Sequence, residues 1–95
     1  MKMKKEEIVC RIIAHVGILS KDRSGWSKEV NIVSWNDGPA RIDIRSWSPD
    51  HEKRSRGITL NGDEAQRLID SVQARDAVGM LQEIESSLRE KSFER

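Results

Sequence analysis

A single change of hydrophobic period, at Asn61, divides this 95-residue chain into two parts that favour different secondary structures. Before it, three β-favouring runs at residues 8–20, 26–35 and 41–48 are separated by short turn segments, and a fourth short run at 57–60 follows a polar loop. After it, apolar residues recur every three or four positions, as on one helix face. The pattern predicts an α+β fold, a four-stranded antiparallel β-meander followed by helical structure.

Alternation of side chains is clearest in the third expected strand, at residues 41–48. Ile42 and Ile44 fall on one face, and the opposite face carries Arg41, Asp43, Arg45 and Trp47. One face therefore belongs to a core and the other does not.

The second expected strand, at residues 26–35, alternates less regularly. Val30 and Ile32 have one parity, whereas Val33 and Trp35 have the other. A β-bulge in this strand would explain the mixture, and so would burial of both its faces. The sequence does not separate these two explanations.

The helical part begins with a capping-box pattern, in which Asn61 is the expected N-cap and Glu64 the N3 residue. A first apolar stripe leads to Arg75 and Asp76, where the period slips and a second, heptad-like stripe begins. We therefore expect either one kinked helix or two helices. We also expect the chain to divide into a binding part, residues 1–74, and a helical C-terminal extension, residues 75–95, whose last residues are frayed. The second stripe, expected at the contact between two copies of the chain, consists of Ala77, Leu81, Ile84 and Leu88.

Composition indicates a single small domain with a thin core. The charged fraction is 35% and the hydrophobic fraction 36%, so a homodimer is a reasonable expectation for a chain of this length. Cys10 is the only cysteine and cannot form an internal disulfide, which fits a reducing, cytoplasmic setting, associated with the nucleoid if the source is bacterial. Charges interrupt the apolar residues near the N-terminus, so neither a signal peptide nor a membrane span is expected.

Positive charge is concentrated in the β-rich part. Residues 1–60 carry 12 basic and 8 acidic side chains, net +4, whereas residues 61–95 carry 5 and 8, net −3. Cations alternate with an aromatic ring on the third strand and in the loop after it, an arrangement that suits phosphates and stacked unpaired bases. The residues of this expected single-stranded nucleic-acid surface are Arg41, Arg45, Trp47, His51, Lys53, Arg54 and Arg56.

A purely structural interpretation of the same residues stays open. In this interpretation, Arg45 pairs with Asp43 or Glu29, Trp47 is half-buried, and the basic side chains of the loop are simply solvated. The second strand adds further candidates to the binding surface. Trp26 and Lys28 share a parity and would extend the track, although Trp26 also suits hairpin packing. Trp35 suits core packing and base stacking equally.

No pattern for enzyme chemistry is present, so we expect a binding protein and not an enzyme. The sequence has no glycine-rich phosphate loop, no serine elbow and no second cysteine for redox work. His15 with Cys10, or His51 with Asp50 and Glu52, does not have the spacing of a zinc site. We expect no metal, no cofactor and no small-molecule substrate.

Four segments occur in order before the capped helix: Gly25-Trp26-Ser27-Lys28-Glu29-Val30-Asn31, Val33-Ser34-Trp35-Asn36, Ile42-Asp43-Ile44-Arg45-Ser46-Trp47-Ser48-Pro49-Asp50-His51-Glu52-Lys53 and Gly57-Ile58-Thr59-Leu60. Together they resemble the YdbC-type branch of the positive cofactor four transcriptional-coactivator family. The resemblance implies a homodimer of curved four-stranded sheets, each followed by a helix. It also implies sequence-tolerant binding of single-stranded DNA, in transcription, replication or repair.

Carried over by position, the resemblance implies that phosphates and bases contact Lys28, Arg45, Trp47, Lys53, Arg54 and Arg56, with Trp35 as a hairpin aromatic. The eukaryotic coactivators carry an aromatic pair at the end of the third strand, but here the second position is Ser48. Two alternatives stay open: an adaptor whose C-terminal stripe docks a partner helix, and a protein that binds single-stranded RNA.

Overall fold

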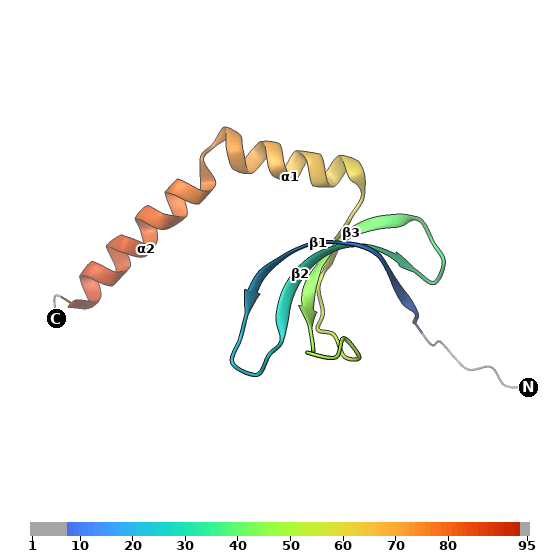
Figure 1. The fold of residues 1–95 in the computed structure, drawn as a ribbon. Coiled ribbons are helices and arrows are strands. Elements are labelled where there is room, and N and C mark those ends of the chain that lie inside the picture. The colour runs from blue at the N-terminus through green and yellow to red at the C-terminus, as the bar shows by residue number, and fades with distance from the viewer. Residues whose placement is uncertain (1–7, 94–95) are drawn as a thin grey trace, which may run out of the picture. The chain divides into compact units, whose positions relative to one another are not determined.

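The computed structural model describes residues 8–93 and places four strands before two helices (Figure 1). The strands form one antiparallel sheet in the order β1-β2-β3-β4. The elements are β1 (Cys10–Lys21), β2 (Ser27–Trp35), β3 (Ala40–Trp47), β4 (Ile58–Leu60), α1 (Gly62–Ala74) and α2 (Ala77–Phe93). This confirms the α+β meander and shows that the helical part consists of two helices.

The sheet and the helices belong to separate compact units, and the chain passes from one unit to the other between Gly62 and Asp63. Neither of the helices described within residues 8–93 is long and apolar enough to cross a membrane.

Both hairpin turns are built by polar side chains at the expected positions. The Asp22 carboxylate accepts hydrogen bonds from the backbone N–H groups of Ser24 (2.9 Å) and Trp26 (3.1 Å) in the β1–β2 turn. In the β2–β3 turn, Asn36 and Asp37 both have left-handed φ values, 51° and 61°. These values are typical of the tight type I′ turn, whose twist matches that of the flanking strands.

The sheet has one apolar face and one face that buries polar groups. The apolar face is formed by Val30, Ile32, Ile42, Ile44, Ile58 and Leu60, which stand opposite one another in the strand register. The other face, here called the polar face, carries Ser27, Glu29, Asn31, Val33 and Trp35 from β2 and Arg41, Asp43, Arg45 and Trp47 from β3. The third strand has two faces as predicted, but the expectation about which face is core is wrong for the described residues: Asp43 and Trp47 on the polar face are buried, whereas Ile42 and Ile44 on the apolar face are half-buried.

Irregular pairing occurs in β1 and not in β2. The register between β2 and β3 runs unbroken from Ser27 to Ser34, so a bulge in the second strand is the wrong explanation there. The register between β1 and β2 shifts three times, which leaves Ile13, Val16 and Leu19 as extra residues of β1. Each extra residue bends its strand and increases the local twist, and the curvature of β1 is visible in Figure 1.

A close backbone approach allows β4 to pair with β3. A Cβ atom on Gly57 would lie 2.3 Å from the Ile44 carbonyl oxygen and 2.4 Å from the Arg45 Cβ. No side chain fits at this distance, which is why glycine precedes β4.

Asp76 separates the two helices. It has a left-handed φ of 47°, which ends the first helical segment. Its carboxylate accepts a hydrogen bond from the Gly79 N–H (3.3 Å), and its carbonyl accepts one from the Met80 N–H (3.0 Å). Asp76 is therefore the N-cap of α2, which explains the phase slip at this point in the sequence.

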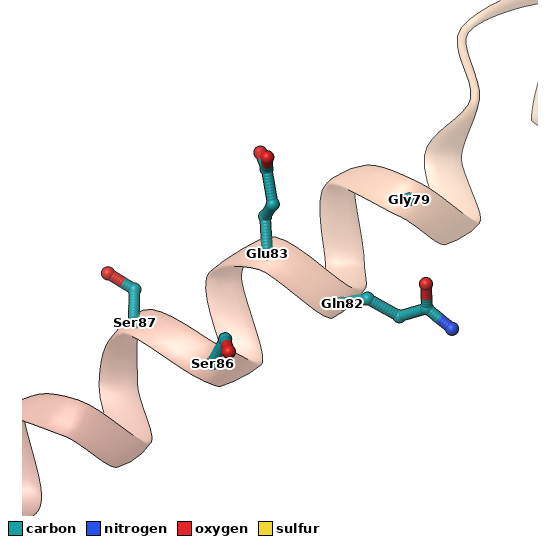
Figure 2. A pocket seen from close by; sticks show the side chains of 5 residues that line it. All are labelled: Gly79, Gln82, Glu83, Ser86 and Ser87. Atoms are coloured by element: carbon teal, nitrogen blue, oxygen red, sulfur yellow. The ribbon is translucent and has the colours of Figure 1, made fainter.

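The two sides of α2 differ in polarity. Leu81, Ile84 and Leu88 are 53%, 54% and 62% exposed and share one side with the half-buried Ala77. A shallow polar hollow lies on the other side, along a single helix (Figure 2), lined by Gly79, Gln82, Glu83, Ser86 and Ser87. The predicted second stripe is thus an uncovered apolar face within the described residues.

Candidate nucleic-acid interface

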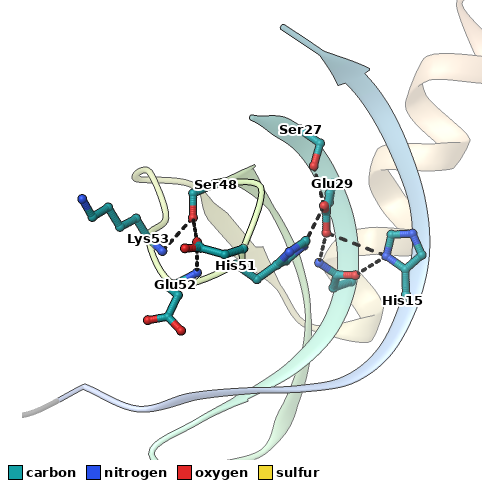
Figure 3. A network of polar contacts seen from close by, with 9 residues as sticks. His15, Ser27, Glu29, Ser48, His51, Glu52 and Lys53 are labelled. Carbon is teal, nitrogen blue, oxygen red and sulfur yellow. Dashed lines mark hydrogen bonds and ion pairs between the residues drawn. The ribbon is translucent and has the colours of Figure 1, made fainter. Parts of the chain in front are cut away.

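The loop between β3 and β4 holds its shape through its own side chains (Figure 3). The Ser48 hydroxyl donates to the Asp50 carboxylate (2.8 Å) and accepts from the Lys53 N–H (2.9 Å). Asp50 also accepts from the Glu52 N–H (2.9 Å), and this bond, followed by that from Ser48, lowers the Asp50 pKa. His51 has a left-handed φ of 61°, and the loop directs its ring toward Glu29 on the polar face.

Glu29 is a buried carboxylate, with its side chain only 4% exposed, between two histidines. It accepts hydrogen bonds from Ser27, from the Asn31 amide (3.2 Å) and from His51 Nε2 (2.9 Å). His15 Nδ1 lies 2.7 Å from Asn31 Oδ1, so the amide that donates to Glu29 accepts from His15. Burial would raise the Glu29 pKa, but the hydrogen bonds from Ser27, Asn31 and His51 outweigh it and lower that pKa.

Aromatic rings and guanidinium groups meet along the polar face of the hairpin formed by β2 and β3, between Trp35 at its turn and Trp47 at the opposite end. The Arg45 and Arg54 guanidinium carbons lie 4.7 Å and 5.0 Å from the centre of the Trp35 ring. Arg54 also lies 5.9 Å from the Trp47 ring, which stacks on His51 at a centroid distance of 5.5 Å. We call these five residues the aromatic–arginine cluster: Trp35, Arg45, Trp47, His51 and Arg54.

The two arginines of the cluster have different environments. Arg45 is 11% exposed and forms short hydrogen bonds, 2.7 Å from Nε and from Nη2, to the fully buried Asp43. Its charge is therefore neutralised, and it positions Trp35. Arg54 is half-buried and donates from Nη2 to the Ile8 carbonyl (3.2 Å). Within residues 8–93 no carboxylate forms an ion pair with Arg54, so its charge is available to an anionic ligand.

A family model described as Transcriptional Coactivator p15 (PC4) matches residues 23–71. This match spans half of the chain, including β2, β3, the loop, β4 and most of α1. The chain belongs to the PC4 family. The predicted resemblance is confirmed, and family membership supports the general expectation of single-stranded DNA binding of the coactivator type.

The PC4-family chain is also similar to an uncharacterized protein of Treponema pallidum (strain Nichols). The two are 46% identical over 54 residues, which cover 57% of this chain and 64% of the other. The chain therefore spans less than two thirds of that relative's length. A bacterial relative is consistent with the YdbC-type branch.

Several predicted site residues of this PC4-family chain lie close together, but two predictions are wrong. One concerns the exposure of Trp47, and the other concerns the face of the sheet on which Lys28 lies. Trp47 is only 3% exposed, because the loop and His51 cover the ring that was expected to be open. Lys28 pairs with Ser46 and lies on the face opposite Arg45, so it does not extend the track of Arg45.

The other predicted residues surround the cluster. Lys53 and Arg56 are exposed in the loop, and Arg41 is half-buried on the polar face at the register position of Val33. Trp26 directly precedes β2, next to the pair formed by Ser27 and Trp47, and is half-buried. The structural interpretation of Arg45 is confirmed, since Arg45 pairs with Asp43, one of its two expected partners. The other, Glu29, binds His51.

Sequence reasoning missed the network around Glu29. Its signal was available, because Ser27, Glu29 and Asn31 are three polar residues of one parity in a central strand. Within residues 8–93, no group of three histidine, cysteine or carboxylate side chains is arranged to hold a metal ion.

Proposed function

We propose that the protein is a homodimer that binds single-stranded DNA with little sequence preference and acts as a regulator in transcription or as an accessory in replication or repair. It acts by binding, in the cytoplasm, and catalyses no reaction. One observation carries the proposal: two guanidinium groups lie over the half-buried Trp35 ring on a curved sheet. Family membership supports it.

The cluster provides both interactions that a single strand needs. An aromatic ring offers a stacking surface to any base, and arginine adds cation–π attraction and phosphate contacts. Arg54 is the cation of the cluster without a carboxylate partner among the described residues, and the exposed Lys53 and Arg56 continue the positive charge along the loop. None of these contacts distinguishes one base from another, which supports sequence tolerance.

The homodimer rests on the uncovered stripe of α2. Leu81, Ile84 and Leu88 are each more than half exposed, and burying them against a second copy would remove their apolar surface from water. Two copies would also double the binding surface offered to one strand.

The binding proposal is tested by fluorescence anisotropy with a labelled dT oligomer. We expect Trp35→Ala and Arg54→Ala each to weaken binding by about 1 to 3 kcal/mol, the usual cost of losing one stacked base. Trp35→Phe should retain most of the affinity, because it keeps an aromatic face. The matched control is Arg67→Ala, which removes an exposed arginine of α1 that takes no part in the cluster.

Full affinity in folded Trp35→Ala and Arg54→Ala would contradict the proposal. Competition with a matched RNA oligomer in the same assay separates DNA from RNA, because stacking and phosphate contacts do not test the sugar.

A further inference from the structure

A hollow beside the aromatic–arginine cluster lies on the polar face, between β1, β2 and the loop. It has a volume of about 330 Å³ and is lined by Ile12, His15, Ile18, Glu29, Asn31 and His51. Ile12 and Ile18 stand in the register opposite Val33 and Glu29, so both belong to the polar face. The volume is at the lower end of small-ligand sites, which suits one flat ring.

The polar groups of the hollow are bonded to one another. His15 Nδ1 donates to Asn31 Oδ1, the Asn31 amide donates to Glu29, and His51 Nε2 donates to Glu29. Figure 3 shows Glu29 between the rings of His15 and His51, with dashed lines to both. The hollow therefore presents isoleucine carbons and imidazole faces to a ligand, and its buried floor is already satisfied.

We propose that this hollow is a slot for one unpaired nucleobase, held by stacking and van der Waals contact and not by hydrogen bonds that read its identity. The inference rests on the proposed function and names a base subsite for it. Ile12 and Ile18 would form the apolar walls, and the rings of His15 and His51 would offer faces for stacking.

Continuity with the cluster identifies the occupant as part of a nucleic-acid strand. His51 lines the hollow and also stacks on Trp47, which lies 5.9 Å from the Arg54 guanidinium. A strand with a phosphate at Arg54 thus passes the mouth of the hollow. Lys21, an exposed cation that shares the polar face through its pairing with Ser27, offers a second phosphate contact beyond Ile18.

Abasic scanning tests the slot. The probe is the shortest dT oligomer that retains full affinity, so that its register is fixed, with one thymine at a time replaced by an abasic site. For the wild-type protein we expect affinity to fall about 5- to 150-fold at one position per subunit, as for the loss of one stacked base. Replacing that thymine by another base should change affinity less than removing it.

Ile18→Trp fills the slot and should abolish the abasic penalty at that position only. The matched control is Val16→Trp, an exposed extra residue of the same strand that does not line the hollow. Ile18→Ala, which widens the slot, should reduce the penalty and serves where Ile18→Trp does not fold. Ile18 is 53% exposed, so the fold tolerates either change better than at a buried site.

An unchanged pattern of abasic penalties in folded Ile18 variants would overturn the slot, as would a strong preference for one base at that position. Trp35→Ala could weaken dT binding while the affinity lost at each abasic site stays the same in the Ile18 variants. That result would reject the slot alone and leave the proposed function standing. Absence of any dT binding by the wild-type protein would reject the proposed function itself.

Discussion

The indole ring of Trp47 is buried because the loop after β3 folds back over it. His51 reaches the ring from a left-handed backbone position that the hydrogen bonds of Ser48 and Asp50 stabilise. The Trp47 Nε1–H is also buried, and it has no hydrogen-bond partner among residues 8–93. Trp47 is therefore the buried ring of the cluster, and Trp35 is the more accessible ring.

Substitutions of Trp47 should act on stability first. We expect Trp47→Ala to lower the free energy of unfolding by about 3 to 5 kcal/mol, the usual cost of removing a buried large aromatic side chain. Trp47→Phe should cost much less, because it keeps a ring and removes the unpaired N–H. Urea unfolding of both variants measures this, and a Trp47→Ala protein as stable as wild type would show that the ring is not part of the core.

Glu29 should make the protein sensitive to acid. Its pKa in the folded protein lies below the ordinary value of 4.5, so its charged form stabilises the fold above that pH, and this stability is lost as pH falls below it. Glu29→Gln should lower stability at neutral pH, and the difference from wild type should shrink below pH 4.5. Unfolding midpoints across this range measure the difference, and Glu52→Gln in the exposed loop is the control.

Alternation alone was enough to assign side chains of β3 to faces, but not to decide which of them are covered. The parity of Arg41, Asp43, Arg45 and Trp47 follows from the pleat of any strand. The burial of Trp47 depends instead on the path of the loop, and that path depends on hydrogen bonds between Ser48, Asp50 and Lys53 that have no simple periodic signal.

Among the elements, the strands and the break between the helices were predictable, and the bulges were not. Turn residues mark the ends of the strands, and the phase slip at Asp76 marks the start of α2. A bulge is a property of two paired strands, so the mixed pattern of β2 could not show that the extra residues, Ile13, Val16 and Leu19, belong to β1.

The apolar stripe of α2 should be the contact between two copies of the chain. Leu81→Asp places a charge in the middle of this stripe, and its desolvation cost should shift the protein toward monomer. Multi-angle light scattering at micromolar concentration measures the mass, with Glu83→Asp, on the polar side of the same helix, as the control. A dimer unaffected by Leu81→Asp would exclude this helix as the interface, and a wild-type monomer would exclude the dimer.

For the whole molecule, the near-neutral net charge of +1 conceals a basic sheet and an acidic helical part. The sheet buries Glu29 and Asp43 with hydrogen-bonded partners, and the loop carries Lys53, Arg54 and Arg56 against Asp50 and Glu52. An anionic strand is therefore attracted to the loop and above all to Arg54, which forms no ion pair with a carboxylate among the described residues.

The central claim is that this loop and cluster neutralise phosphates, and the salt dependence of dT binding tests it most directly. If about four to six phosphates are contacted, log affinity should fall against log salt with a slope of about −3 to −4. Replacing Lys53 and Arg56 together by alanine should flatten the slope by about one to two units, equally for dT and mixed-sequence oligomers. A wild-type slope near zero, or a loss confined to one sequence, would contradict the account.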